Sequence, residues 1–147
     1  MDLERFCEEN GIEAEIIETE ASSKTSKDAA EALDTTVEHI IKSLVFYADS
    51  EPVLVIVRGS DRVDESRVAE VLRAQDCRMA EPEEVKRETG FPVGGVPPVG
   101  AGLPKLVDEK VLDMDRVYGG AGSSNRVIEL DPRFVVGEDD IVAKVTV

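Results

Sequence analysis

Apolar residues concentrate in two runs near the centre of the chain, at residues 40–47 and 52–57, with a short and mostly polar segment between them. Apolar runs bounded by turn residues are typical of buried strands, and two such runs joined by a short polar segment indicate a β-hairpin. Because both runs are almost continuously apolar, we expect this hairpin to lie at the core of the fold.

The remaining elements are shorter. Helical spacing of apolar residues, together with capping residues, predicts helices at residues 3–10, 27–33, 64–74 and 82–87. Short apolar segments predict further strands at residues 14–17, 77–79, 105–107, 117–118, 127–130 and 141–147. Helices and strands intermix without strict alternation, which favours the α+β class. We expect one domain over residues 1–147, with helices flanking a mixed, mostly antiparallel sheet curled toward a barrel.

A stiff loop is predicted at residues 90–100, which read GFPVGGVPPVG. Glycine permits positive φ and close backbone approach, whereas proline fixes φ and removes an amide donor. Such a run is often only a connector, and taken alone it favours neither interpretation. Two other segments favour a functional role: the lysine-containing strand at 40–46 and a second glycine-rich run at 119–126. Together, the three segments predict one site.

The composition is strongly acidic, because 32 Asp and Glu residues face 17 Lys and Arg residues and give a net charge of −15 at pH 7. Such a surface disfavours non-specific contact with nucleic acid. Either the protein never meets a polyanion, or it is adapted to very high salt, where the Debye length falls to ~3 Å at 1 M. We favour the second explanation. The acidic residues are dispersed, which indicates a folded domain rather than an acidic tail.

Several common kinds of site are disfavoured. No stretch approaches the ~20 apolar residues of a membrane span, and the N-terminus is acidic, so we expect a soluble cytoplasmic protein. Cys7 and Cys77 form neither a CxxC motif nor a His/Cys cluster, so we expect two packed free thiols, no metal and no cofactor. His39 is the one histidine, and no serine lies in a nucleophile-elbow context, which favours a structural or surface histidine.

Lys42 differs from the other basic residues in its apolar sequence context. If residues 40–46 form a strand, Leu44 and Phe46 share the face of Lys42, and the opposite face is also largely apolar. In one interpretation the aliphatic stem covers apolar surface while the ammonium reaches water. In the other, Lys42 is a fixed cation for a phosphate or carboxylate at the mouth of the sheet. The residues themselves leave both interpretations open.

Over nearly the whole chain, the sequence resembles the YbaK and prolyl-tRNA synthetase-associated editing-domain family. The matching segments are residues 25–33, 40–46, 58–64, 89–100 and 119–130. Three features carry the resemblance in combination: Lys-Ser-Leu-Val-Phe in the strand, Gly-Phe-x-x-Gly-Gly-Val-Pro-Pro-Val-Gly in the loop, and a glycine-rich segment before an Ile-Glu-Leu strand. Each of them alone is a weak signal.

This resemblance implies an aminoacyl-tRNA deacylase that hydrolyses mischarged tRNA in trans, most often tRNA(Pro) bearing cysteine or alanine, with no metal and no covalent intermediate. It marks Lys42 as the residue essential for activity. It also implies a substrate-binding loop and wall, made of Gly94, Gly95, Val96, Pro97, Pro98, Gly119, Gly120, Ala121 and Gly122. The loop would pack beside the aminoacyl ester, and the wall would receive the terminal adenosine. The expected partners are the tRNA acceptor end and, as an open alternative, prolyl-tRNA synthetase.

One departure from the family pattern keeps alternatives open. Many relatives place histidine after the last glycine of the loop, where this chain has Ala101. Together with the acidic surface, this motivates a second interpretation, in which the protein is a non-catalytic module of the same fold that binds a tRNA end or a synthetase. A third interpretation is a hydrolase of an unrelated small ester, which a closed pocket would favour.

Overall fold

The computed structural model of the protein describes residues 2–19, 25–123 and 125–147. Its strands are β1 (Ala14–Glu18), β2 (Ile41–Ala48), β3 (Glu51–Arg58), β4 (Cys77–Met79), β5 (Lys105–Asp108), β6 (Val117–Gly120), β7 (Arg126–Leu130) and β8 (Ile141–Ala143). Its α-helices are α1 (Leu3–Glu9), α2 (Ser26–Ala32), α3 (Glu65–Leu72) and α4 (Pro82–Thr89), and its 3₁₀ helices are η1 (Val37–His39), η2 (Glu109–Asp113) and η3 (Pro132–Val135). No helix within these ranges is long and apolar enough to cross a membrane.

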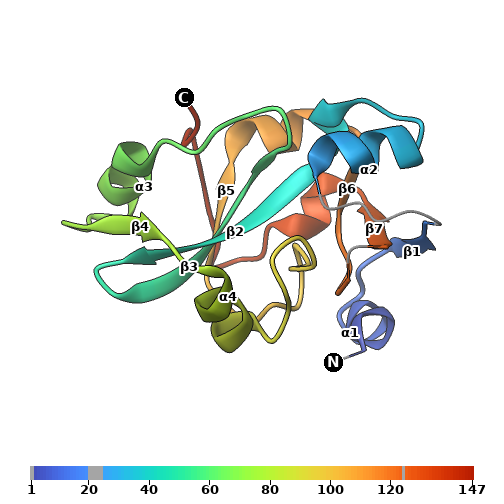
Figure 1. The fold of residues 1–147 in the computed structure, drawn as a ribbon, viewed down its shortest axis with the longest axis horizontal. Helices are drawn as coiled ribbons and strands as arrows, with labels where there is room; N and C mark the ends of the chain where they lie inside the picture. The colour runs from blue at the N-terminus through green and yellow to red at the C-terminus, as the bar shows by residue number, and fades with distance from the viewer. Residues whose placement is uncertain (1, 20–24, 124) are drawn as a thin grey trace.

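The larger sheet is built around the hairpin that the apolar runs predict. β2 and β3 pair antiparallel along their whole length, with Lys42 opposite Val57. β4 joins the end of β2 antiparallel, whereas β5 joins β3 and β8 joins β5 in parallel, which gives the order β4-β2-β3-β5-β8. In Figure 1, β2 crosses the molecule diagonally, with β4 near one end and β6 toward the other.

The smaller sheet has the order β1-β7-β6 and is antiparallel throughout. A parallel bridge between Ile40 and Tyr118 connects it to the start of β2. The mixed, mostly antiparallel α+β fold is therefore confirmed. Its described strands form two open sheets, and neither of them closes into a barrel.

Two hydrophobic clusters lie on opposite faces of β2, because successive side chains of a strand alternate between its faces. Ile41 and Val45 belong to the larger cluster, which residues of α1, β6 and β7 complete. Phe46 belongs to the second cluster, together with Val57 of β3 and Val68 of α3. The hairpin thus lies between two cores, as its continuously apolar sequence predicts.

The C-terminal strand that we expected at residues 141–147 is shorter in the structure. β8 ends at Ala143, and the chain then pairs with the loop after β3 through an antiparallel bridge between Val63 and Thr146. Val145 and Thr146 are fully buried in this position. The apolar pattern correctly indicates burial but merges two pairings into one strand, because alternation does not identify the partner of a strand.

Candidate active site

A cavity of about 520 Å³ borders the edge of β2 between the two sheets. β4 pairs with β2 only from Phe46 onward, and β6 meets it at the Ile40–Tyr118 bridge, so no described strand pairs with this edge of residues 41–44. The cavity is lined there by β2, β6, the β4–α4 junction and the loop after α4. The split between the two sheets therefore creates the site, and its volume lies within the roughly 300–1,000 Å³ of small-molecule pockets.

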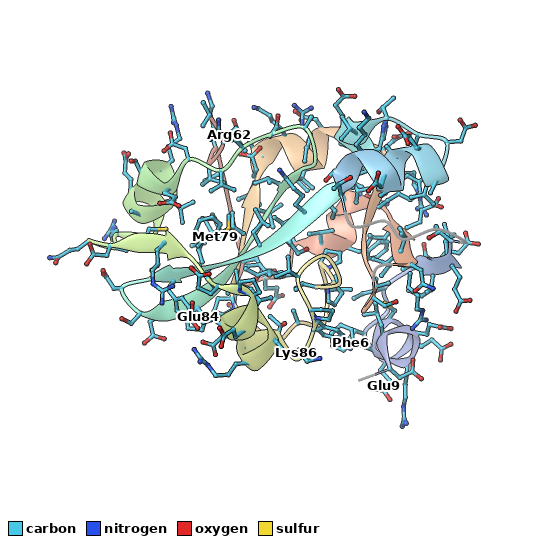
Figure 2. All side chains as sticks on the ribbon, viewed as in Figure 1. Phe6, Glu9, Arg62, Met79, Glu84 and Lys86 are labelled. Atoms are coloured by element: carbon cyan, nitrogen blue, oxygen red, sulfur yellow. The ribbon has the colours of Figure 1, made fainter. Side chains whose placement is uncertain are left out.

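The lining of this cavity has an unusual charge for so acidic a chain. Among the described residues that line it there is no Asp or Glu, whereas Lys27, Lys42 and Arg126 all contribute. Figure 2 labels two of the many carboxylates that lie elsewhere, Glu9 on α1 and Glu84 on α4. A cavity that holds cations and excludes carboxylates favours an anionic ligand.

Lys42 is half-buried on β2, and its Nζ donates a hydrogen bond to the backbone carbonyl oxygen of Asp61 at 2.7 Å. Burial lowers the pKa of the Lys42 ammonium, and the nearby Asp61 carboxylate opposes part of that shift. The ammonium is thus fixed in the lining of the cavity. This geometry fits the fixed-cation interpretation of Lys42 better than a side chain that extends freely into water.

The loop at residues 94–98 packs directly against the glycine-rich end of β6. A Cβ atom on Gly120 would lie only 3.0 Å from the carbonyl oxygens of Gly94 and Val96. On the other side of this contact, the Gly122 amide donates to the Gly95 carbonyl oxygen at 2.8 Å. Gly94 itself has a φ of 84°, which disfavours any residue with a side chain. The two glycine-containing segments are therefore shaped for each other.

The structure divides the predicted substrate-binding residues into two groups. Gly94, Val96, Gly119 and Gly120 line the cavity with Lys42. The remaining residues lie outside the lining, namely Gly95, Pro97, Pro98, Ala121 and Gly122.

Lys105 at the start of β5 anchors the end of the residue 94–98 loop. The sequence did not predict this role. Its Nζ donates to the carbonyl oxygens of Pro98 at 3.2 Å and Val135 at 2.5 Å. The Asp140 carboxylate lies 3.5 Å away, and burial lowers the pKa of Lys105. The sequence gives one weak signal of this role, a lysine at the start of a short apolar strand.

Two further polar residues of the cavity, Ser43 and Arg126, lie in the predicted segments, but the sequence assigned neither of them a role of its own. Ser43 Oγ and Arg126 Nε are buried and have no hydrogen-bond partner. Among the described residues, no other buried side-chain nitrogen or oxygen atom lacks a partner. Both residues line the cavity. Buried polar atoms are nearly always hydrogen-bonded, so unsatisfied atoms at a cavity are typical of a site that a ligand or water completes.

The other candidate chemical groups lie outside this lining. His39 hydrogen-bonds Thr36 Oγ1 through its Nδ1 at 2.8 Å. Burial raises the pKa of both the Cys7 and the Cys77 thiols, so neither is a ready thiolate nucleophile. Ala101 packs against the larger core cluster. None of these four residues contributes to the cavity lining.

Comparison with known proteins identifies the family. The family model for the aminoacyl-tRNA editing domain matches residues 20–135. The chain belongs to the aminoacyl-tRNA editing domain family. Its resemblance to YbaK-type and prolyl-tRNA synthetase-associated editing domains is therefore confirmed, and the matched range contains Lys42 and both glycine-containing segments.

Several relatives of this editing domain are proline–tRNA ligases. The ligase of Lactobacillus acidophilus is 37% identical over 119 residues, which cover 78% of this chain and 21% of the ligase. The chain thus spans about a fifth of the length of that relative. The uncharacterized protein YwhH of Bacillus subtilis is 33% identical over 123 residues, which cover 82% of this chain and 78% of YwhH.

Solved structures share the fold of the editing domain closely. A candidate trans-editing enzyme for prolyl-tRNA synthetase superimposes with a TM-score of 0.83 at 34% identity, covering 91% of this chain and 87% of its own. The hypothetical protein APE2540 superimposes with a TM-score of 0.93 at 28% identity over the full length of both chains. The editing domain described here is thus related both to parts of synthetases and to proteins of its own size.

Proposed function

We propose that the protein is an aminoacyl-tRNA deacylase that hydrolyses mischarged tRNA in trans, with Cys-tRNA(Pro) or Ala-tRNA(Pro) as its substrate. One observation carries the proposal: a cavity without lining carboxylates, in a chain of net charge −15, holds a fixed lysine ammonium. The 3′ end of a charged tRNA brings a phosphodiester backbone and an activated ester together, and a compact cation suits both.

The mechanism needs little chemistry from the protein, because an aminoacyl ester is already activated. Holding the ester in one orientation toward the attacking group contributes up to ~7–11 kcal/mol in favourable cases. Lys42 then anchors a phosphate or stabilises the negative charge that develops on the ester oxygen. For alanine, water adds to the carbonyl carbon and the ribose oxygen leaves with a proton. For cysteine, the thiol of the substrate is an alternative intramolecular nucleophile.

Selection of a small amino acid fits the other end of the cavity. Ala80, Val85, Val93 and Val96 line it and make that part of the surface aliphatic. The residue 94–98 loop lies close against Gly120, and we expect this arrangement to exclude larger side chains. A hydrophobic pocket separates analogues that differ by one methylene by only ~1–3 kcal/mol, so we expect graded rather than absolute selection.

A second candidate function is a non-catalytic module that binds the tRNA end or prolyl-tRNA synthetase. The observation that favours it is Ala101, which packs into the core where many relatives carry histidine. Under this alternative, the cavity would bind the acceptor end without turnover.

A deacylation assay separates these functions. The substrates are Cys-tRNA(Pro) and Ala-tRNA(Pro), measured side by side at low and molar salt, with Pro-tRNA(Pro) as the control. We expect loss of the mischarged amino acids and retention of proline. If the protein binds tRNA without deacylating it at either salt concentration, the binding module is established instead. If the protein shows no binding and no deacylation, both functions are excluded.

A further inference from the structure

The loop after β3 holds the ammonium of Lys42. Within the described residues, the hydrogen bond from Lys42 Nζ goes to a backbone atom, the Asp61 carbonyl oxygen, at 2.7 Å. A lysine side chain has a flexible stem of four carbon atoms, so its ammonium can occupy many positions. The hydrogen bond to one fixed acceptor therefore determines where the charge lies. The position of this carbonyl depends on how firmly the loop itself is held.

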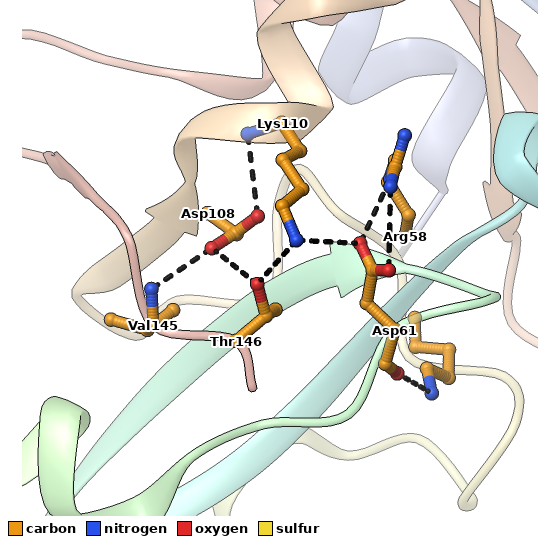
Figure 3. A network of polar contacts seen from close by, with 7 residues as sticks. Arg58, Asp61, Asp108, Lys110, Val145 and Thr146 are labelled. Carbon is orange, nitrogen blue, oxygen red and sulfur yellow. Dashed lines mark hydrogen bonds and ion pairs between the residues drawn. The ribbon is translucent and has the colours of Figure 1, made fainter.

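The side chain of Asp61 is clamped in turn, as Figure 3 shows. Arg58 donates to both of its carboxylate oxygens, from Nε at 2.8 Å and from Nη2 at 3.3 Å. Lys110 Nζ lies 4.0 Å from the same carboxylate. The Asp61 side chain is 13% exposed, and the Arg58 hydrogen bonds hold the pKa of its carboxyl below the ordinary value. A carboxylate with this geometry restrains the residue that carries it.

The network continues into the last residues of the chain. Lys110 Nζ donates to Thr146 Oγ1 at 3.1 Å, and Thr146 Oγ1 donates to Asp108 Oδ1 at 3.3 Å (Figure 3). Asp108 and Thr146 are both fully buried, and the Val145 amide donates to the same Asp108 oxygen at 2.9 Å. A buried polar network with its members satisfied is rigid, because each displaced group would leave another without a partner.

Backbone hydrogen bonds join the same two segments. The Val147 amide donates to the Arg62 carbonyl oxygen at 2.9 Å, and the Asp64 amide donates to the Val145 carbonyl oxygen at 2.8 Å. Arg62 and Asp64, the two residues that flank Val63, are therefore hydrogen-bonded to the C-terminal segment. The loop that holds Lys42 is restrained at its side chain by Arg58 and at its backbone by residues 145–147.

We propose that Asp61 is a positioning residue for Lys42, which fixes the ammonium in the cavity through its carbonyl oxygen while Arg58, Lys110 and the C-terminal segment 145–147 fix Asp61. This inference rests on the proposed deacylase function for its catalytic consequence. Its geometric part, the coupling of Asp61 to the state of Lys42, is measurable without any substrate.

The charges around Lys42 determine the sign of the expected effect. Asp61 is the carboxylate that acts on it, Arg58 and Lys110 face Asp61, and Lys27 lines the same cavity from α2. Burial lowers the pKa of Lys42, and the Asp61 charge raises it. Replacing Asp61 by asparagine keeps the size of the side chain but removes this charge and weakens the Arg58 clamp. The pKa of Lys42 should then fall further below that of an ordinary lysine.

The test compares Asp61→Asn with Asp64→Asn, a matched change in the same loop. Asp64 caps α3 by accepting hydrogen bonds from the Ser66 and Arg67 amides, and asparagine caps a helix equally well. NMR of ¹³C-methylated lysines, assigned with Lys42→Arg, follows the titration of Lys42, and steady-state deacylation kinetics give kcat and KM. We expect Asp61→Asn to lower the Lys42 titration midpoint and to reduce kcat at least tenfold with KM within twofold. Asp64→Asn should match the wild type in both measurements.

An unchanged titration midpoint in folded Asp61→Asn protein would overturn the positioning role. If that variant does not fold, Thr146→Val replaces it, because it breaks the network two contacts away from Asp61, at the partner of Lys110, and should shift the Lys42 midpoint in the same direction. An unchanged midpoint in Thr146→Val would then overturn the role of the C-terminal segment. If the wild-type protein itself shows no deacylation, the proposed function fails, and the titration alone decides the positioning of Lys42.

Discussion

Two hollows among the described residues differ in how their charged groups are paired. The cavity along β2 is lined by cations without carboxylates. The second hollow, which we call the charged hollow, lies between the β2–β3 turn, β4 and α4 and contains both signs of charge. There, Arg78 donates to both carboxylate oxygens of Glu84 at 2.9 Å, and Tyr47 donates to Glu88 at 2.7 Å. Each of these groups has a partner within the same hollow.

This difference separates a surface whose polar groups pair with one another from one that keeps polar atoms without a hydrogen bond. Arg78 also lies over the ring of Tyr47, with its guanidinium carbon 4.8 Å from the ring centroid, so that the charged hollow is satisfied internally. The cavity instead borders two atoms without a hydrogen bond, Ser43 Oγ and Arg126 Nε, while Nη2 of the same guanidinium pairs with Glu4 at 2.9 Å. We therefore locate function by the availability of polar groups rather than by their number.

The largest expected effect comes from removing the Lys42 ammonium from the cavity. Lys42→Ala should lower the rate of deacylation at least tenfold, which corresponds to ~1.4 kcal/mol of transition-state stabilisation. The fold should persist, because alanine removes a half-buried charge rather than a packed apolar group. Single-turnover kinetics on mischarged tRNA and a thermal melt measure the two effects.

Two further variants sharpen this result. Lys42→Arg should restore little activity, because a planar guanidinium does not replace a compact ammonium in a confined site. Lys144→Ala, which removes an exposed lysine near the C-terminus, serves as the control and should retain the wild-type rate. Wild-type deacylation by Lys42→Ala would contradict the assignment of the cavity as the active site.

The next effect concerns the shape of the cavity. Gly120→Ala places a Cβ atom 3.0 Å from two backbone carbonyl oxygens of the opposing loop, which cannot move as a flexible side chain would. We expect reduced deacylation and a lower melting temperature, because the loop and β6 must separate. In the control Gly137→Ala, the nearest atom is a carboxylate oxygen of Asp140 at 3.1 Å, at the end of a side chain. Equal behaviour of the two variants would show that the close contact has no role.

The two parts of the site differ in how far the sequence predicts them. The hairpin, the stiff loop and the glycine-rich strand end follow from local patterns, because continuous apolar runs and Pro/Gly clusters restrict the backbone directly. The position of the cavity does not follow from them. It depends on where β4 stops pairing with β2 and where β6 diverges, and strand partners are set by tertiary packing.

The same limit explains the residues that were missed. Lys105 donates a hydrogen bond to the backbone carbonyl oxygen of Pro98, which lies 7 residues away in the sequence. Asp61 accepts a hydrogen bond from Lys42, which lies 19 residues away. Neither residue belongs to a sequence motif that indicates its chemical role. Ser43 stands beside Lys42 in the sequence, but strand alternation puts the two on opposite faces, and only an unpaired strand edge lets both border one cavity.

The smallest expected effect comes from breaking the charged hollow, and it completes the comparison. The hydrogen bonds from Arg78 and from the Glu81 amide lower the pKa of Glu84 to about 2. A depressed carboxyl pKa stabilises the folded state above the ordinary value of 4.5, and this contribution is lost as the pH falls from 4.5 toward 2. Glu84→Gln should therefore melt slightly below the wild type at pH 7, with the difference disappearing near pH 2. Deacylation should stay within twofold, since Glu84 borders the charged hollow and not the cavity.

The exposed neighbour Glu83 provides the matched control for this last prediction. Glu83→Gln removes the same charge from the first turn of α4 but leaves the hydrogen bonds of Glu84 in place. Thermal melts at several pH values, together with single-turnover deacylation, compare the two variants. A pH-independent stability difference for Glu84→Gln would contradict the internal pairing of the hollow. A large loss of deacylation in that variant would instead show that the charged hollow takes part in tRNA recognition, and the distinction drawn between the two hollows would fail.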